Sequence, residues 1–195
     1  MTITEELYAL FQARTDVYAQ CWYSNKDKRY AYKSIKSEYT PKILDKHLTD
    51  TKSKGIGVYP LLRDDECKWV AADFDIHDEE EKNDVMMALD RIYHIADGLE
   101  LPIYTETSKS GNGLHVWMFF SEVVKSWKAR KLMMTLIEEA QASTLSSMDR
   151  LFPSQDRLHQ DTKGFGNLIH LPFSAHFCPK GTVFFDRDGE KYTNS

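Results

Sequence analysis

Lys68-Trp69-Val70-Ala71-Ala72-Asp73-Phe74-Asp75 is the stretch of sequence that decides the fold. Its apolar part, Trp69 to Ala72, lacks polar alternation and is typical of a central strand covered on both faces. Asp73 and Asp75 follow in the same strand, where alternate side chains project from one face. Two neighbouring carboxylates repel each other unless a cation lies between them. The stretch therefore predicts a buried strand that ends in a site for Mg²⁺ or Mn²⁺, which prefer oxygen ligands.

Two other interpretations of the aspartate pair stay open at this point. The pair also fits a polar strand end that runs into the acidic start of a helix. An isolated Asp-x-Asp sequence occurs in glycosyltransferases as well.

Helices and further strands are expected on both sides of this stretch. Acids in the first turn and a final glycine predict a helix over 78–98, and Thr40-Pro41 has the preferred order for a helix start. Two other helices are expected, from Thr4 as N-cap to about Arg14 and from about Ser126. Further strands are expected at 56–62, 102–107, 114–120, 167–171 and 182–186, with a turn at 187–189. Some strands adjoin and others alternate with helices, which indicates an α+β fold with a mixed or antiparallel sheet.

Length and composition favour one globular domain spanning residues 1–195. Apolar residues make up 42% of the 195, enough for a packed interior. No apolar run approaches the roughly 20 residues of a membrane span, and the N-terminus lacks a signal-peptide pattern. Cys21, Cys67 and Cys178 are odd in number and widely spaced, which fits neither a disulfide framework nor a zinc knuckle. We therefore expect a cytoplasmic protein without a membrane partner.

Positive charge is concentrated in residues 26–54. That segment has nine Lys or Arg against four acids, so it carries +5 within a chain of net charge −5. Tyrosines interleave with these cations, a mixture suited to phosphate contact and base stacking. The alternative is an ordinary solvated face. The tyrosines are Tyr30, Tyr32 and Tyr39, and the expected template-binding residues are Lys26, Lys28, Arg29, Lys33 and Lys36.

A glycine-rich turn, Ser110-Gly111-Asn112-Gly113-Leu114-His115, is the second candidate for chemistry. Glycines allow backbone N–H groups to approach an anion closely. His115 opens an apolar strand and would contact a triphosphate there, with Lys109 adding positive charge. A plain hairpin with a hydrogen-bonded histidine is the alternative.

A third region supplies two candidate acids, Asp149 and Asp156, in Met148-Asp149-Arg150-Leu151-Phe152-Pro153-Ser154-Gln155-Asp156. Either carboxylate would complete a metal site, and the other would cap a turn or pair with Arg150 or Arg157. We favour Asp149, because Asp156 stands in a polar stretch beside Arg157 and there has the simpler role of an exposed ion pair.

Taken together, these residues resemble the archaeo-eukaryotic primase superfamily, whose motifs are an Asp-x-Asp pair on a strand, a Ser-Gly-x-Gly-x-His turn and a later hydrophobic residue followed by Asp. The similarity is greatest to the primase-polymerase domains of bacterial conflict systems and CRISPR-associated operons. Five of their segments occur here in order, from about residue 12 to 186. They correspond to residues 14–19, 57–62, 71–75, 110–117 and 149–172.

The resemblance implies a two-part fold, with an N-terminal α/β unit (1–66) carrying the basic segment and an RNA-recognition-motif-like catalytic module (67–195). It implies a DNA primase-polymerase that makes or extends primers on single-stranded DNA from NTPs or dNTPs with two Mg²⁺ or Mn²⁺ ions. Asp73, Asp75 and Asp149 would hold the metal ions, with Asp156 as the other candidate. The implied nucleotide-binding residues are Lys109, Ser110, Gly111, Gly113 and His115, followed by Lys163, Asn167 and His170.

The family also suggests a helicase or CRISPR adaptation proteins as partners. Its members often continue into a helical or zinc-bearing region, and no helicase segment is present here. We therefore expect the domain to act alone or as one part of a longer protein.

Two functions of other classes compete with the primase. One is a non-catalytic module that binds single strands. The other is a metal-dependent or Rep-like nuclease, although the His-x-His pair that a Rep-like enzyme needs is absent from the sequence. The scatter of His159, His170 and His176 suggests zinc only weakly, since no Cys-x-x-Cys accompanies it.

Overall fold

The central strand, β4 (Glu66–Asp75), is covered on both faces, as the sequence predicts. A computed structural model describes residues 2–158 and 164–192 of the chain. In it, β4 lies between β6 (Gly113–Lys125) and β7 (Met148–Phe152) and pairs antiparallel with both. Residues 69–72 are fully buried. A strand without a solvent face must have a layer of structure on each side, and this requirement organises the molecule.

The sheet around β4 has six strands in the order β10-β9-β5-β6-β4-β7, and every pairing in it is antiparallel. We call it the large sheet. Its remaining strands are β5 (Ile103–Thr107), β9 (Phe184–Phe185) and β10 (Lys191–Tyr192).

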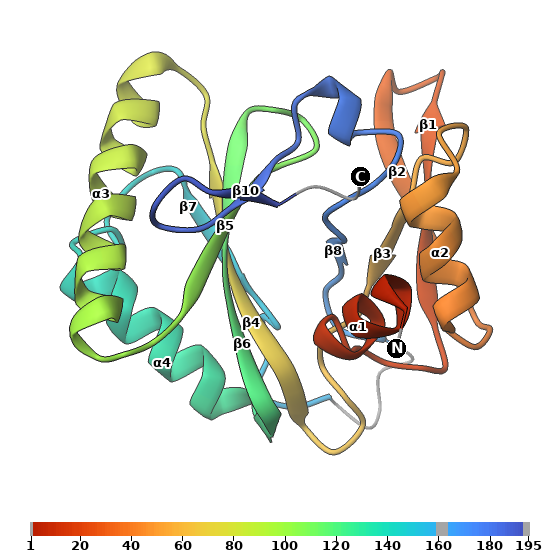
Figure 1. Ribbon diagram of the computed structural model, residues 1–195, viewed down its shortest axis with the longest axis horizontal. Coiled ribbons are helices and arrows are strands. Elements are labelled where there is room, and N and C mark those ends of the chain that lie inside the picture. Colours follow the sequence, from red (N-terminus) through yellow and green to blue (C-terminus); the bar gives the residue numbers. More distant parts are fainter. Residues whose placement is uncertain (1, 159–163, 193–195) are drawn as a thin grey trace.

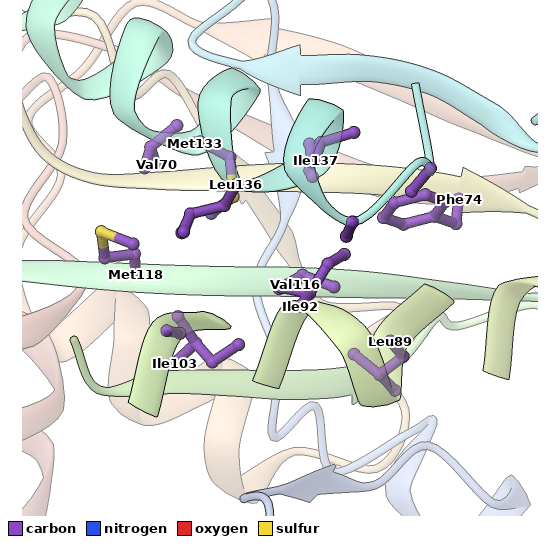
Figure 2. Close-up of a cluster of buried hydrophobic side chains, with 14 of the residues drawn as sticks. Val70, Phe74, Leu89, Ile92, Ile103, Val116, Met118, Met133, Leu136 and Ile137 are labelled. Atoms are coloured by element: carbon purple, nitrogen blue, oxygen red, sulfur yellow. The ribbon is translucent and has the colours of Figure 1, made fainter. Parts of the chain in front are cut away.

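Two helices, α3 (Glu79–Gly98) and α4 (Ser126–Glu139), cover one face of the large sheet (Figure 1). Their apolar residues pack against alternate residues of β4 and β6, because side chains at spacing two share a face of a strand. Figure 2 shows this core in close-up. It includes Val70, Phe74, Val116 and Met118 from the strands, Leu89 and Ile92 from α3, and Met133, Leu136 and Ile137 from α4.

A smaller antiparallel sheet forms the other layer, in the order β2-β1-β3-β8. We call it the small sheet. It consists of β1 (Tyr18–Ser24), β2 (Arg29–Ile35), β3 (Ile56–Val58) and β8 (Ile169–His170). Together with α1 (Ile3–Leu10) and α2 (Pro41–Thr49) it occupies the side of the molecule opposite α3 and α4 (Figure 1). The chain therefore returns late in its course, through β8, to the unit in which it began.

Aromatic packing joins the two layers. Trp69 and Trp117, on the face of the large sheet turned away from α3 and α4, belong to one core with Phe11 and with Ile56 of β3. The rings of Phe11 and Trp117 meet edge to face at 5.4 Å. Buried His47 strengthens the small-sheet side, because its Nε2–H donates to the Pro172 carbonyl and its Nδ1 accepts from the Ile56 N–H.

The α+β class and the antiparallel arrangement are confirmed. The helix over 78–98 begins after the N-cap Asp78 and ends at Gly98. The helices opened by Thr40-Pro41 and Ser126 also begin where the sequence predicts. The comparison of the large sheet with an RNA-recognition motif and the division of the chain at residue 66 stay predictions.

The predicted start of the first helix is wrong. Its N-cap is Thr2, not Thr4, and the helix ends at Leu10 rather than near Arg14. Thr2 and Glu5 have the spacing of a capping box, in which each side chain accepts a hydrogen bond from the other residue's backbone N–H. This reciprocal pair satisfies the backbone N–H groups of Thr2 and Glu5. Thr4 forms no such pair.

Strand lengths also differ from those predicted. The strand expected over 56–62 ends at Val58, before Pro60, which has no N–H to give to a ladder. The strands expected at 167–171 and 182–186 are only two residues long, at Ile169–His170 and Phe184–Phe185. The strand expected over 114–120 continues to Lys125 and pairs with β4 almost throughout.

The basic segment contains structure that its composition hides. Residues 18–35 form the β1–β2 hairpin, with Tyr23 opposite Tyr30 and Cys21 opposite Tyr32. No strand is predicted there from the sequence, because the cations mask the alternation of the apolar residues.

We predict that Met133→Ala lowers the free energy of unfolding by about 2–5 kcal/mol, because Met133 is fully buried between α4 and the large sheet and its truncation leaves a cavity. Met87→Ala is the matched control, since Met87 lies on α3 with 54% of its side chain exposed. Its effect should stay within about 0.5 kcal/mol. Urea unfolding of both variants gives the comparison, and equal losses would contradict the core described above.

Candidate metal and nucleotide site

A row of polar residues crosses the large sheet on the face turned toward the small sheet. On β4, Asp73 stands opposite Arg150 of β7 on one side and opposite His115 of β6 on the other. His115 in turn stands opposite Glu106 of β5. Directly opposed residues of antiparallel strands project from the same face. Four ionisable side chains thus lie in line along this face, which also carries Trp69 and Trp117.

Three carboxylates meet at one end of this row. One oxygen from each of Asp73, Asp75 and Asp149 can be chosen so that all three lie within 4.8 Å of one another. Among residues 2–158 and 164–192, this is the group of His, Cys, Asp and Glu side chains that is close enough to hold a metal ion. The set offers only carboxylate oxygens, the donors that Mg²⁺ and Mn²⁺ prefer.

A break in the strand pairing brings Asp149 into this group. On β7, Arg150 is opposite Asp73 and Met148 is opposite Phe74, so Asp149 is an additional residue between two paired ones. Such a bulge bends the strand and changes the direction of a side chain. Asp149 therefore reaches Asp73 and Asp75, although strict alternation would not predict it.

The electrostatics of the cluster fit a cation. Partial burial is the largest cause that raises the pKa of Asp75, and the charges of Asp73 and Asp149 raise it further. The guanidinium of Arg150 pairs with Asp149 and offsets part of this negative charge. A divalent cation would relieve the remaining repulsion among the three carboxylates.

His115 is held in place from two sides. Its Nδ1 lies 2.8 Å from a carboxylate oxygen of Glu106, and its Nε2 lies 3.4 Å from Asp73. The same Glu106 oxygen accepts a hydrogen bond from the Trp117 indole at 3.2 Å. Burial lowers the pKa of His115, but the charges of Glu106 and Asp73 and their hydrogen bonds outweigh it and raise the value to about 9. His115 is therefore a buried cation between two carboxylates, next to the acidic cluster.

The glycine-rich turn leads directly into this histidine. Gly113 is opposite Asp75, and a Cβ atom at Gly113 would come within 2.6 Å of the Phe74 carbonyl oxygen. Only glycine allows the turn to approach β4 this closely. Within the turn, the Ser110 hydroxyl accepts from the Asn112 N–H and bonds to the Ser108 hydroxyl. Gly111 has a φ of +77° and ends the tight bend.

The small sheet supplies polar groups that have no partner. Both ring nitrogens of His170 are buried and lack a hydrogen bond to the described residues. The hydroxyl of Tyr32 is also buried and has the Cys21 thiol as its polar neighbour. The two rings are neighbours, 6.0 Å apart, and the Lys109 ammonium lies 5.2 Å from the Tyr32 ring centre. Unpaired buried polar groups are costly, so this cluster is suited to a polar ligand.

Other residues named from the sequence lie elsewhere or have another role. The Asn167 amide accepts from the Ser154 N–H and donates to the Leu151 carbonyl, so it fastens the segment after β7. Asp156 forms an ion pair with Arg130, away from the three carboxylates. Lys163 and His159 lie outside the described residues.

The lysines and arginine expected to bind template are all exposed and lie on or beside the β1–β2 hairpin. Tyr39 cannot stack on a base, contrary to the sequence interpretation, because it is 1% exposed and packs against Tyr8. Tyr32 faces the region between the sheets rather than the outer surface.

Comparison with protein families agrees with this geometry. Residues 4–195 match the family described as the archaeo-eukaryotic primase domain of the TOTE conflict system. The chain belongs to this family. The match confirms the primase resemblance and the conflict-system part of it. A link to CRISPR-associated proteins stays a prediction.

No curated protein shows a significant match to this primase domain. None of the helices in its described residues is long and apolar enough to cross a membrane. As a member of the family, the domain is expected to act on nucleic acid and nucleotides.

Sequence reasoning missed Glu106 in this primase domain. Glu106 lies in β5 between two threonines and is 2% exposed. A charged residue is almost never fully buried unless it is paired, and its position within Thr105-Glu106-Thr107 was the available signal. Its partners His115 and Trp117 follow on the next strand, where only the sheet register shows the contact.

We predict that Mn²⁺ or Mg²⁺ raises the melting temperature of the primase domain, because ions that bind only the folded state stabilise it. At 100 times the dissociation constant the gain is about 2.7 kcal/mol. Asp73→Asn and Asp149→Asn should abolish the shift. Asp156→Asn, which also removes one negative charge, should retain it, and the opposite result for Asp149 and Asp156 would exchange their roles.

Proposed function

We propose that this primase domain is a DNA primase-polymerase, which joins nucleotides on a single-stranded DNA template with two divalent ions. The observation that carries the proposal is the convergence of Asp73, Asp75 and Asp149 beside His115 on one face of the large sheet. Membership of the primase family supports the same reaction class.

Asp73, Asp75 and Asp149 are the proposed metal ligands. Bound Mg²⁺ or Mn²⁺ would lower the pKa of the attacking 3′-hydroxyl and offset the charge of the leaving pyrophosphate. The chain's own contribution is a rigid set of oxygens, since Asp73 and Asp75 share the doubly covered strand β4. Arg150 would balance the excess negative charge of Asp149.

His115, Lys109 and the glycine-rich turn are the proposed contacts of the incoming triphosphate. His115 has a raised pKa and therefore carries a positive charge at neutral pH. Glu106 fixes the ring, so that Nε2–H is directed toward Asp73 and the cluster. The Lys109 ammonium and the turn at 110–113 would contact phosphate oxygens. Within the turn, the N–H groups of Gly111 and Asn112 already donate to the Ser108 carbonyl and the Ser110 hydroxyl. The unpartnered His170 is the proposed contact from the small sheet.

The other side of the glycine-rich turn is less suited to a triphosphate. A hollow of about 490 Å³ lies there, between the turn and the start of α3. Its lining includes Asp78 and Glu79 against a single lysine, Lys82. Their negative charge would repel phosphate, whereas the side facing the small sheet has Lys109 and His115.

The β1–β2 hairpin is the proposed contact for template. Lys26, Lys28 and Arg29 lie around its turn, and Lys33 and Lys36 lie along and just beyond β2. These side chains are exposed and would neutralise phosphates of a single strand.

We predict that Asp73→Ala combined with Asp75→Ala abolishes nucleotide incorporation without unfolding the protein. The carboxylates of Asp73 and Asp75 repel each other, so replacing both should leave the melting temperature of the protein unchanged or higher. Unprimed and primed single-stranded DNA, labelled nucleotides and Mn²⁺ or Mg²⁺ give the readout on a gel. Near wild-type extension by the double variant would disprove the assignment.

The same gel tests the rival functions. Shortened DNA in place of extended DNA would identify a nuclease. DNA binding without any product from the wild-type protein would identify a non-catalytic module.

We predict that His115→Ala weakens nucleotide binding at least tenfold and single-stranded DNA binding much less, because one charge-assisted contact to phosphate is lost. Titrations of the metal-loaded protein with a labelled nucleoside triphosphate and a labelled oligonucleotide separate the two affinities. Equal losses would show that His115 acts through the packing of the sheet instead.

A further inference from the structure

Two lysines converge on one histidine at the edge of the small sheet. The ammonium groups of Lys54 and Lys180 lie 3.2 Å and 2.6 Å from Nε2 of His176. The other ring nitrogen, Nδ1, donates to the Thr51 carbonyl at 2.8 Å. Nε2 is therefore the acceptor for Lys180, and its single lone pair serves one donor. The Lys54 ammonium also lies 3.5 Å from Nδ1 and is thus placed over the ring. One neutral lone pair does not offset two positive charges.

No described carboxylate pairs with Lys54 or Lys180. Two other lysines do have acidic partners, Lys82 with Glu79 and Lys125 with Glu66. Like charges in close proximity destabilise each other unless an anion lies between them. The two lysines therefore make a site for an anion, which we call the lysine pair.

Aromatic rings extend from the lysine pair. Lys180 lies over the ring of Phe177 at 5.4 Å, and Phe177 meets Tyr30 at 5.0 Å. Tyr30 in turn meets Tyr23 at 5.3 Å, across the β1–β2 hairpin. Tyr23 is 42% exposed, so the row ends in a ring that is accessible to a ligand. Cations beside accessible rings match the alternation of phosphates and bases in a single strand.

The same groups border the proposed active site. Phe177 contacts the ring of His170 at 5.3 Å, and Lys54 precedes Gly55. Gly55 has a φ of +77°, and a Cβ atom there would come within 2.8 Å of His170. The backbone thus approaches His170 closely and places Lys54 beside it. A strand held by the lysine pair would lie next to the polar cluster of His170, Tyr32 and Lys109.

We propose that the lysine pair binds a phosphate of single-stranded nucleic acid, with Tyr23 and Tyr30 as the stacking surface for an adjacent base. The proposal rests on the nucleic-acid partner of the proposed function and adds residues outside its metal and triphosphate sites. A single strand offers successive phosphates and bases, so it can occupy the lysine pair and the rings of Phe177, Tyr30 and Tyr23 together.

The test measures binding of a labelled 20-nucleotide oligo(dT) to the full chain by fluorescence anisotropy, without metal, over a range of salt concentrations. The double variant Lys54→Ala/Lys180→Ala removes the lysine pair. Lys42→Ala/Lys46→Ala is the matched control, because these lysines are exposed on α2 and the change in charge is the same. A labelled nucleoside triphosphate with Mn²⁺ serves as the second probe.

We expect Lys54→Ala/Lys180→Ala to weaken oligo(dT) binding about tenfold at 0.1 M salt. The slope of log affinity against log salt should become shallower by about 0.7, the contribution of one neutralised phosphate. The control should change neither value, and Lys54→Arg/Lys180→Arg should restore both. Equal losses in the control, or no loss in the variant, would overturn the proposal, as would loss of triphosphate binding alone.

Neighbouring residues on β1 test the aromatic part. Trp22 and Tyr23 are similarly exposed but project from opposite faces, and only Tyr23 belongs to the row. Tyr23→Leu should weaken oligo(dT) binding about tenfold, in the range of one lost stacking contact. Trp22→Leu should leave it unchanged, and the reverse order would place the strand on the other face. Because no synthesis is measured, this result is independent of whether the domain polymerises nucleotides.

Discussion

The close approach of three carboxylates is the constraint on which the site and its surroundings depend. Asp73, Asp75 and Asp149 repel one another, although Asp75 and Asp149 are exposed. Partial burial of Asp75 and the charges of the other two carboxylates raise its pKa. The surrounding structure must hold them against that repulsion. It does so through apolar packing on both faces of β4, which fixes two of the acids. The bulge in β7 then supplies the third.

The two faces of the large sheet have different roles. One face buries apolar side chains under α3 and α4, and this core stabilises the fold (Figure 2). The other face carries the row of Arg150, Asp73, His115 and Glu106 in strand register. A polar row of this kind is tolerated because its members pair with one another. Its location between the sheets also brings it opposite the basic hairpin.

Charge is separated across the space between the sheets. The large sheet brings the carboxylates together, while the small sheet and its loops bring together lysines and unpartnered histidine nitrogens. This arrangement reconciles a net charge of −5 with a nucleic-acid partner, because the local field, rather than the total charge, acts on a bound strand. Metal ions and phosphates would each find a complementary surface.

The sequence by itself determined the elements and the chemistry whose signals are local. The apolar run before Asp73, the acids at 78–81 and the glycines at 111 and 113 predict a covered strand, a helix and a tight turn. Only the tertiary structure decided which distant residues meet. Glu106 contacts His115 through strand register, Asp149 reaches Asp73 and Asp75 through a bulge, and His176 contacts Lys54 across 122 positions of sequence. Local patterns record backbone preferences, whereas these contacts depend on how strands pair and layers pack.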